Sequence, residues 1–391
     1  MLGLIALAEV LGMATWFAAT AVAPQLAARW GLGPAATGWL STAVQLGFVA
    51  GTALAAVLNL ADILPSREYF VASALAASLA NAGLLLAPGF RSALLARALT
   101  GACLAGVYPP AMKMAATWFR DRRGLAIGTV VGALTIGKAL PYLVHAMPHA
   151  GVHQVVIASS GAAVLAALLV AALYRDGPAP FPRRRFDVAL VGVVLRDRRY
   201  RLVLGGYLGH MLELYAYWVW LPAFIAASVA AHDPGAVPST AHVALLSFVV
   251  IAAGAIGCVA GGEIADRIGH ARLVVIAMAM SGGCALASAV VFGGSTAVLM
   301  LLLLAWSVTV IADSAQFSTL VTRVVPPHAT GTALTLQTSL GFLLTTLSIQ
   351  SIPMLVHVTG WRYAFAVLAV GPALGIAAMR RLSVGREESG R

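Results

Sequence analysis

Apolar residues run through this chain in long blocks, and polar residues gather in the short intervals between them. An α-helix needs about 20 apolar residues to cross the hydrocarbon core of a bilayer, and twelve blocks reach that length. They lie at residues 2–23, 36–60, 69–87, 92–118, 124–147, 152–174, 201–227, 241–263, 272–292, 296–321, 330–355 and 360–380. Gly and Pro recur inside these blocks, as is usual in membrane helices. The pattern predicts an all-α polytopic membrane protein with twelve transmembrane helices.

Composition and charge placement support this prediction and give it an orientation. The chain is 60% hydrophobic and only 10% charged, far from the composition of soluble domains. Of its 25 Lys and Arg residues, 19 lie in alternate polar intervals and the C-terminal tail, whereas the opposite intervals hold only Arg29, Arg91 and Arg362. The positive-inside rule therefore predicts that both termini are cytoplasmic. A nucleic-acid-binding surface would gather its positive charge on one folded face, so the net charge of +11 does not indicate such a partner.

The cysteines and the first span narrow the class of protein further. Three cysteines at unrelated spacings fall inside predicted spans and indicate no disulfide, metal or cofactor site. The first span lacks a basic leader and a small-residue cleavage site, so we expect it to be retained. We expect a monomeric, multi-pass protein of a bacterial inner membrane.

The longest polar interval divides the twelve spans into six and six. The basic, Pro-rich segment "RDGPAPFPRRRFDVALVGVVLRDRRYR" begins at residue 175, so we predict one six-helix bundle at 1–174, a cytoplasmic linker at 175–200 and a second bundle at 201–391. Four positions recur at a constant shift of 204 residues: Glu9 and Glu213, Trp16 and Trp220, Pro34 and Pro238, and Asp62 and Asp266. This register indicates an internal duplication, and in such proteins the substrate site lies between the repeats near the bilayer midplane.

The segment "GGEIADRIGHARL", residues 261–273, resembles the signature loop of the major facilitator superfamily, with matches at Gly262, Ala265, Asp266, Arg267 and Gly269. The first-half equivalent "LNLADILPSR" retains Asp62, and "RALTG" is similar to the fourth-span motif of the superfamily. The resemblance implies two pseudo-symmetric six-helix halves, secondary transport by alternating access, and a gating role for Asp62, Asp266 and Arg267. Glycine permits the tight turn of such a loop, and an aspartate near a helix end can accept bonds from a neighbouring helix N-terminus.

Ionisable residues within spans are costly and normally face a partner or an interior cavity. The resemblance implies that spans one, four, seven and ten line the central cavity, with spans two, five, eight and eleven contributing. His210, Glu213, Tyr217 and Trp220 share one helical stripe, and spans one, five and ten have similar stripes. We predict that the substrate and coupling site comprises Glu9, Trp16, Arg97, Lys138, Tyr142, His210, Glu213, Tyr217, Trp220, Asp313 and Gln316.

Charge type suggests what this site carries. A lysine in the wall of span five favours an anionic or zwitterionic small molecule, and the fifth-span motif typical of drug exporters is not intact. Glu213 and His210 lie one turn apart and suit proton coupling. An exporter of drug-like or cationic compounds is the alternative, and a non-transporting receptor or scaffold on the same fold is a second. Because neither G-x-S-x-G nor H-E-x-x-H occurs, we do not expect an enzyme.

Overall fold

The computed structural model describes residues 1–119, 123–178, 186–235 and 238–388, with the side chains of residues 62, 123 and 383–388 outside the description. Its regular structure within these ranges is helical, and ten helices or helix pairs are long and apolar enough to cross a membrane. Together with the first and last spans, they account for the twelve predicted ones. The main helices are α1 (Leu2–Met13), α2 (Ala18–Ala21), α3 (Ala23–Trp30), α4 (Pro34–Val57), α5 (Leu60–Ile63), α6 (Ser66–Ala82), α7 (Phe90–Leu104), α8 (Tyr108–Trp118), α9 (Arg123–His145), α10 (Val152–Leu173), α11 (Val191–Arg196), α12 (Arg198–His232), α13 (Thr240–Ile268), α14 (His270–Val291), α15 (Thr296–Ala312), α16 (Ser314–Val324), α17 (Thr330–Ala364) and α18 (Val370–Glu388).

Three predicted spans are interrupted part of the way along. The first consists of α1 and α2 with a turn at residues 14–17, the fourth of α7 and α8, and the tenth of α15 and α16 with Asp313 between them. Interrupted helices expose backbone groups, which a membrane protein tolerates only where protein or a cavity covers them. The interruptions therefore point to the interior of the bundle as the place where polar chemistry occurs.

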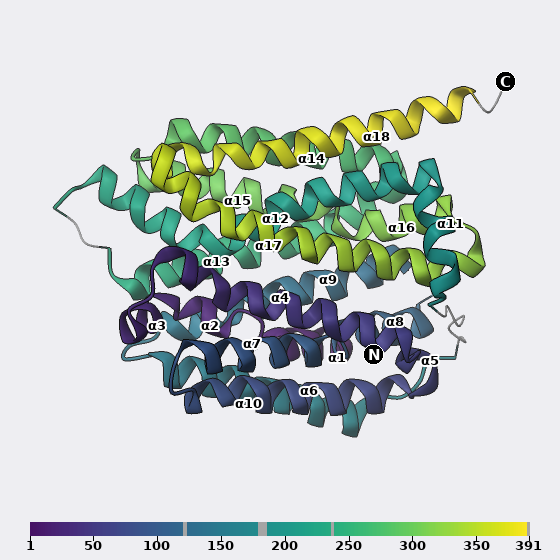
Figure 1. The fold of residues 1–391 in the computed structure, drawn as a ribbon, viewed down its shortest axis with the longest axis horizontal. Coiled ribbons are helices and arrows are strands. Elements are labelled where there is room, and N and C mark those ends of the chain that lie inside the picture. The colour runs from purple at the N-terminus through teal and green to yellow at the C-terminus, as the bar shows by residue number, and fades with distance from the viewer. Residues whose placement is uncertain (120–122, 179–185, 236–237, 389–391) are drawn as a thin grey trace.

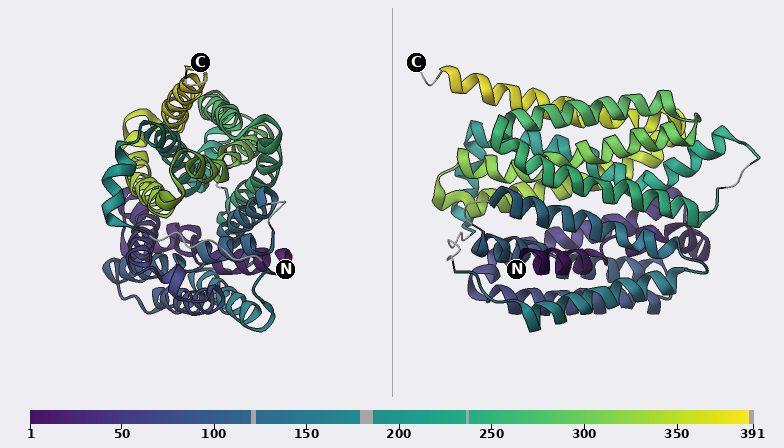
Figure 2. Two further views of the ribbon diagram at one scale, coloured as in Figure 1. Left: turned by 90° about the vertical axis from the view of Figure 1, so that its right-hand side faces the viewer. Right: turned by 180° about the vertical axis from the view of Figure 1, so that it is seen from behind.

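The helices form two groups that lie side by side (Figures 1 and 2). Helices before residue 175 pack mainly on one another, as α4 does on α7 and α6 on α10, and those after residue 197 do the same, as α12 does on α17 and α18. The groups meet along two helix pairs, α9 with α13 and α4 with α17. Each half thus supplies two helices to a shared interface.

The two ends of the bundle differ in what they carry. One end, here called the linker end, holds α5 and α11, and the other end holds α3 and the C-terminal end of α12 (Figure 1). Within the predicted linker, α11 follows a 3₁₀ turn (Val188–Leu190).

Glycines allow α9 and α13 to approach backbone to backbone. A Cβ added at Gly128 would lie 2.8 Å from the carbonyl oxygen of Cys258, and one at Gly132 would lie 3.2 Å from that of Ala255. Side chains at these positions would force the helices apart, since such separations are shorter than van der Waals contact. The glycines therefore set the distance between the halves along this seam.

The signature loop joins this seam at the linker end. Gly269 ends α13 with φ +92°, a backbone conformation that suits glycine, so the turn into α14 depends on it. Asp266 lies against the first turn of α9, where a Cβ added at Gly124 would be 3.1 Å from Asp266 Oδ2. Arg267 instead pairs with Glu263 at 2.5 Å on its own helix, with both side chains exposed. The side chain of Asp62 in α5, the predicted counterpart of Asp266, lies outside the described part of the structure.

Replacing Gly269 by Ala should destabilise the protein by about 1–3 kcal/mol, because a side chain at this positive φ strains the backbone. The expected result is a lower melting temperature of the full chain in detergent. Gly283→Ala is the matched control, since Gly283 lies in α14 with open space around it. Equal melting temperatures for the two variants would show that the turn does not need glycine.

Replacing Asp266 by Asn should weaken contact between the halves at the linker end, because it removes the charge that faces the N-terminus of α9. Distances between spin labels on the two halves at this end should then shift towards larger values. Glu263→Gln, which alters an exposed carboxylate on the same helix, should leave the distribution unchanged. Identical distance distributions for Asp266→Asn and the unaltered chain would exclude a role of Asp266 in holding the two halves together at this end.

Candidate functional site

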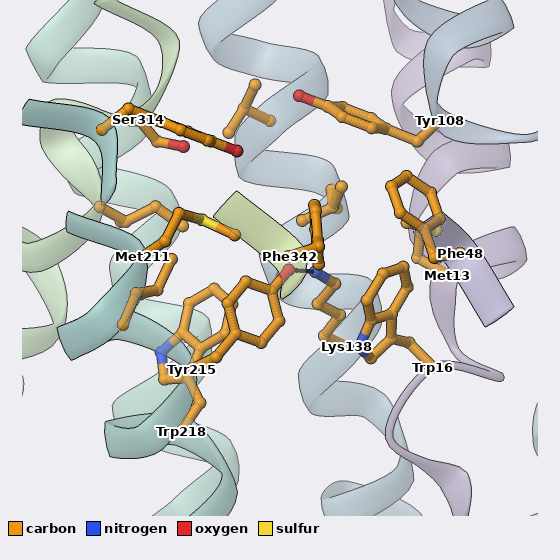
Figure 3. Close-up of a pocket in the computed structure, with 15 residues that line it drawn as sticks. Met13, Trp16, Phe48, Tyr108, Lys138, Met211, Tyr215, Trp218, Ser314 and Phe342 are labelled. Carbon is orange, nitrogen blue, oxygen red and sulfur yellow. Dashed lines mark hydrogen bonds between the residues drawn. The ribbon is translucent and has the colours of Figure 1, made fainter. Parts of the chain in front are cut away.

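A small cavity lies between the two halves (Figure 3). Its volume is about 60 Å³, and residues from both halves line it. The wall comprises Met13, Trp16, Phe48, Tyr108, Val131, Leu134, Lys138, Tyr207, Met211, Leu214, Tyr215, Trp218, Ile311, Ser314 and Phe342. Lys138 is the one basic side chain among these residues, and none of them carries a carboxylate. The cavity therefore offers a single positive charge within a largely apolar and aromatic wall.

Lys138 extends from α9 into a cage of aromatic rings. Its Nζ lies 4.0 Å from the ring centre of Trp16, 4.7 Å from that of Tyr215 and 5.6 Å from that of Trp218. It also donates a hydrogen bond to the Tyr215 hydroxyl. A desolvated cation–π contact contributes about 2 kcal/mol or more, so these rings offset part of the cost of burying the ammonium. Because Trp16 belongs to the first half and the other two rings to the second, the ammonium connects the halves.

Arg97 positions the cage by holding the interrupted first span. Its guanidinium is fully buried on α7 and donates to the carbonyl oxygens of Thr15 and Trp16. The turn at residues 14–17 leaves these carbonyls without a partner in their own helix. A third bond runs to Asn81 Oδ1 at 2.7 Å, and Asn81 in turn donates to Ser160. Arg97 is absent from the cavity wall, and its contact with the backbone of Trp16 orients one wall of the cage.

Glu9 lies on α1 behind Lys138, fully buried and away from the cavity wall. α1 and α9 approach closely here, since a Cβ added at Gly137 would lie 2.5 Å from the carbonyl oxygen of Val10. Glu9 interacts electrostatically with Lys138 through this contact. Both of its carboxyl oxygens lack a hydrogen-bond donor within the described structure. The first half thus holds a buried carboxyl group whose hydrogen-bonding capacity is unused.

The carboxyl groups of the second half are engaged differently. Glu213 Oε1 accepts a bond from Trp306 Nε1 at 2.7 Å, and its Oε2 accepts one from Ser281 at 2.9 Å. His210 Nδ1 lies 2.9 Å from Asp313 Oδ1, at the interruption between α15 and α16. All these partners belong to the second half, so the charged stripe of α12 faces its own bundle and not the cavity.

The remaining predicted residues also lie outside the cavity wall. Tyr217 donates to the carbonyl of Leu303, and Trp220 donates to that of Ile349. Tyr142 is buried one turn beyond Lys138, and Gln316 bonds to His270 Nδ1 at 2.7 Å. Of the eleven predicted site residues, the structure places Trp16 and Lys138 on the wall.

The opposite face of α12 supplies the wall residues that sequence reasoning missed. Tyr207, Met211, Tyr215 and Trp218 recur at helical spacing and line the cavity. The stretch "YAYWVW", residues 215–220, signalled an aromatic cluster, but it presents rings on both faces of the helix. A prediction from the spacing of charged residues therefore selected the face of α12 that packs inside the second half, and not the face that lines the cavity.

Comparisons with known proteins agree with this architecture. A family model described as Major Facilitator Superfamily matches residues 5–349. A solved bacterial homologue of the human lysosomal transporter Spinster, inward-facing and occupied, superposes with a TM-score of 0.72 at 15% identity, covering 98% of this chain and 96% of that one. The transporter FucP in its outward conformation gives a TM-score of 0.69 at 15% identity, with 97% and 98% covered.

No curated protein matches the sequence. At 15% identity the solved structures establish the fold alone, but the family model covers most of the chain. The chain belongs to the Major Facilitator Superfamily and is a multi-pass membrane transporter, not an enzyme.

Proposed function

We propose that this transporter moves a small organic anion across the membrane by alternating access and couples the movement to protons. The observation that carries the proposal is the wall of the cavity, where Lys138 supplies the one positive charge and no carboxylate opposes it. A buried ammonium is costly in a membrane protein, and an arriving anion would stabilise it. A zwitterion would bring a positive charge for which the wall holds no counter-charge.

The alternative substrate, a cationic compound, has one observation in its favour. Aromatic rings bind cations, and Trp16, Tyr215 and Trp218 form a suitable cage. That cage already surrounds the ammonium of Lys138, however, so a second cation would meet repulsion there. A receptor or scaffold would not require a costly buried lysine between its halves, because the pairs α9 with α13 and α4 with α17 already join them. Both considerations favour an anion transporter.

Proton coupling needs a buried group that gains and loses a proton during transport. Glu213 is buried, lies outside the cavity wall and has uncharged partners in Trp306 and Ser281. The nearby pair of His210 and Asp313 offers a second protonatable group on the same side of the bundle. We assign Glu213 as the coupling residue, with His210 and Asp313 as its neighbours in proton exchange.

The proposed orientation follows from the arginine-rich intervals. The linker end carries α5 and α11 (Figure 1). The positive-inside rule assigns such an end to the cytoplasm, together with both termini. We propose the inner membrane of a bacterium as the location and the monomer as the working unit.

Glu213→Gln should abolish proton-driven accumulation while preserving expression and folding, because the amide keeps the shape of the carboxyl group but does not titrate. Accumulation of substrate in proteoliposomes under an imposed pH gradient measures this, and substrate exchange without a gradient should persist. Glu263→Gln, on the exposed surface of α13, serves as the control. Accumulation at the unaltered rate would rule out Glu213 as the coupling residue.

Lys138→Ala should weaken the affinity for an anionic substrate by about 1.5–3 kcal/mol, the scale of a hydrogen bond to a charged group. If Lys138 serves only to neutralise Glu9, the same variant should instead reduce the yield of folded protein, and adding Glu9→Gln should restore it. A double-mutant cycle that measures both affinity and yield separates these roles. Restored yield with unchanged affinity would contradict the anion site.

A further inference from the structure

The cavity has polar groups at two ends and apolar side chains between them. At one end the ammonium of Lys138 meets the hydroxyl of Tyr215, and at the other the hydroxyls of Tyr108 and Ser314 point into the space (Figure 3). Met13, Phe48, Met211 and Phe342 occupy the region between these ends. A molecule that fills the cavity therefore meets a charge at one end and mainly apolar surface along its length.

The wall accommodates one negative charge and not two. Arg97 is the nearest other buried cation in the first half, but its guanidinium is committed to the carbonyls of the first span and to Asn81. A second carboxylate would meet the neutral hydroxyls of Tyr108 and Ser314 and no positive charge, and a buried charge without an opposite partner is strongly disfavoured. Inorganic phosphate would suffer similarly, since it requires several donors and the charged end offers an ammonium and a tyrosine hydroxyl.

The volume limits the length of the molecule. The cavity measures about 60 Å³, less than half of the roughly 150 Å³ of an engineered cavity that holds benzene. It therefore accommodates a molecule of only a few non-hydrogen atoms. Longer chains would require displacement of side chains such as Met211, which borders the space from α12.

We infer that the substrate is a short-chain organic monocarboxylate, with its carboxylate at Lys138 and Tyr215 and its alkyl chain against the methionine and aromatic wall. This inference rests on the proposed transport of anions and specifies their class. The Tyr215 hydroxyl would donate a hydrogen bond to the carboxylate, and the Lys138 ammonium would donate another at the same time. A neutral amide of the same length would lose the charge interaction and bind weakly.

The test is direct binding of radiolabelled propionate to the full chain in detergent at neutral pH, with unlabelled competitors. Butyrate should displace propionate, whereas propionamide, succinate and inorganic phosphate at equal concentration should displace it at least tenfold less effectively. Lys138→Gln should lower the affinity for propionate at least tenfold. Lys113→Gln changes the other lysine of the chain, which lies on α8 and donates to the carbonyl of Ala61, and it should leave the affinity within twofold.

A second variant changes the size of the cavity. Met211→Ala should enlarge it and raise the affinity for hexanoate relative to propionate by about tenfold or more, the scale at which a hydrophobic pocket distinguishes chain lengths. A merely structural role of Met211 would weaken both ligands alike and leave their ratio unchanged, and that result would overturn the inference even if Lys138→Gln failed to fold.

The remaining outcomes separate this inference from the proposed function. Tighter binding of succinate or phosphate than of propionate, with loss in Lys138→Gln, would overturn the monocarboxylate and retain an anion transporter. Binding of tetramethylammonium with no binding of any anion would overturn both. Propionate binding that is equal in Lys138→Gln and the unaltered chain would overturn the assignment of the site.

Discussion

The ammonium of Lys138 is buried between two halves of a membrane protein, and the rings that compensate its charge come from both. Trp16 contributes from the first half, and Tyr215 and Trp218 contribute from the second. The position of Trp16 depends on the interruption of the first span, which in turn depends on Arg97. A series of contacts thus runs from Arg97 in α7 to the cavity. Arg97 binds the free carbonyl groups of the first span, and this holds Trp16 beside the ammonium of Lys138.

The constant shift of 204 residues predicts an internal duplication, and the two halves surround their corresponding buried carboxyl groups differently. Glu9 and Glu213 occupy corresponding positions, 204 residues apart. Trp306 and Ser281 donate to Glu213, whereas Glu9 has no donor within the described residues and faces a lysine across a close helix contact. One carboxyl group is therefore fixed by neutral donors, and the other lies near the charge that we propose binds substrate. Such an asymmetry permits different roles for equivalent positions.

The fold was predictable from the sequence because long apolar blocks and the signature loop are strong signals. The family match confirms the superfamily, and helices occupy each of the twelve predicted spans. Interruptions of the first, fourth and tenth spans were not predicted, because composition alone does not show where a neighbouring arginine will capture backbone carbonyls. The break at residues 14–17 is a clear instance, since its partner Arg97 lies more than 80 residues away.

The candidate site was predictable only in part, for a geometric reason. Spacing correctly placed His210, Glu213, Tyr217 and Trp220 on one stripe of α12, but it cannot tell which neighbour that stripe faces. Hydrogen bonds to Trp306, Leu303 and Ile349 turn it into the second half. Lys138 was identified because a lysine within a span is rare and costly, and Trp16 because it shares a helical stripe with Glu9. Tyr215 and Trp218 were missed because aromatic residues are common in membrane helices and carry no comparable signal.

The glycine seam between α9 and α13 has a mechanical consequence. At Gly128 and Gly132 the helices approach the carbonyl groups of Cys258 and Ala255, so few side-chain atoms interlock at these two positions. Interlocked side chains resist gradual displacement, because each must change rotamer before its neighbour can pass. A smooth backbone contact imposes no such barrier, and one helix can roll on the other while the spacing between them stays constant. We therefore expect the glycine positions to be the part of this seam along which one half turns most easily against the other.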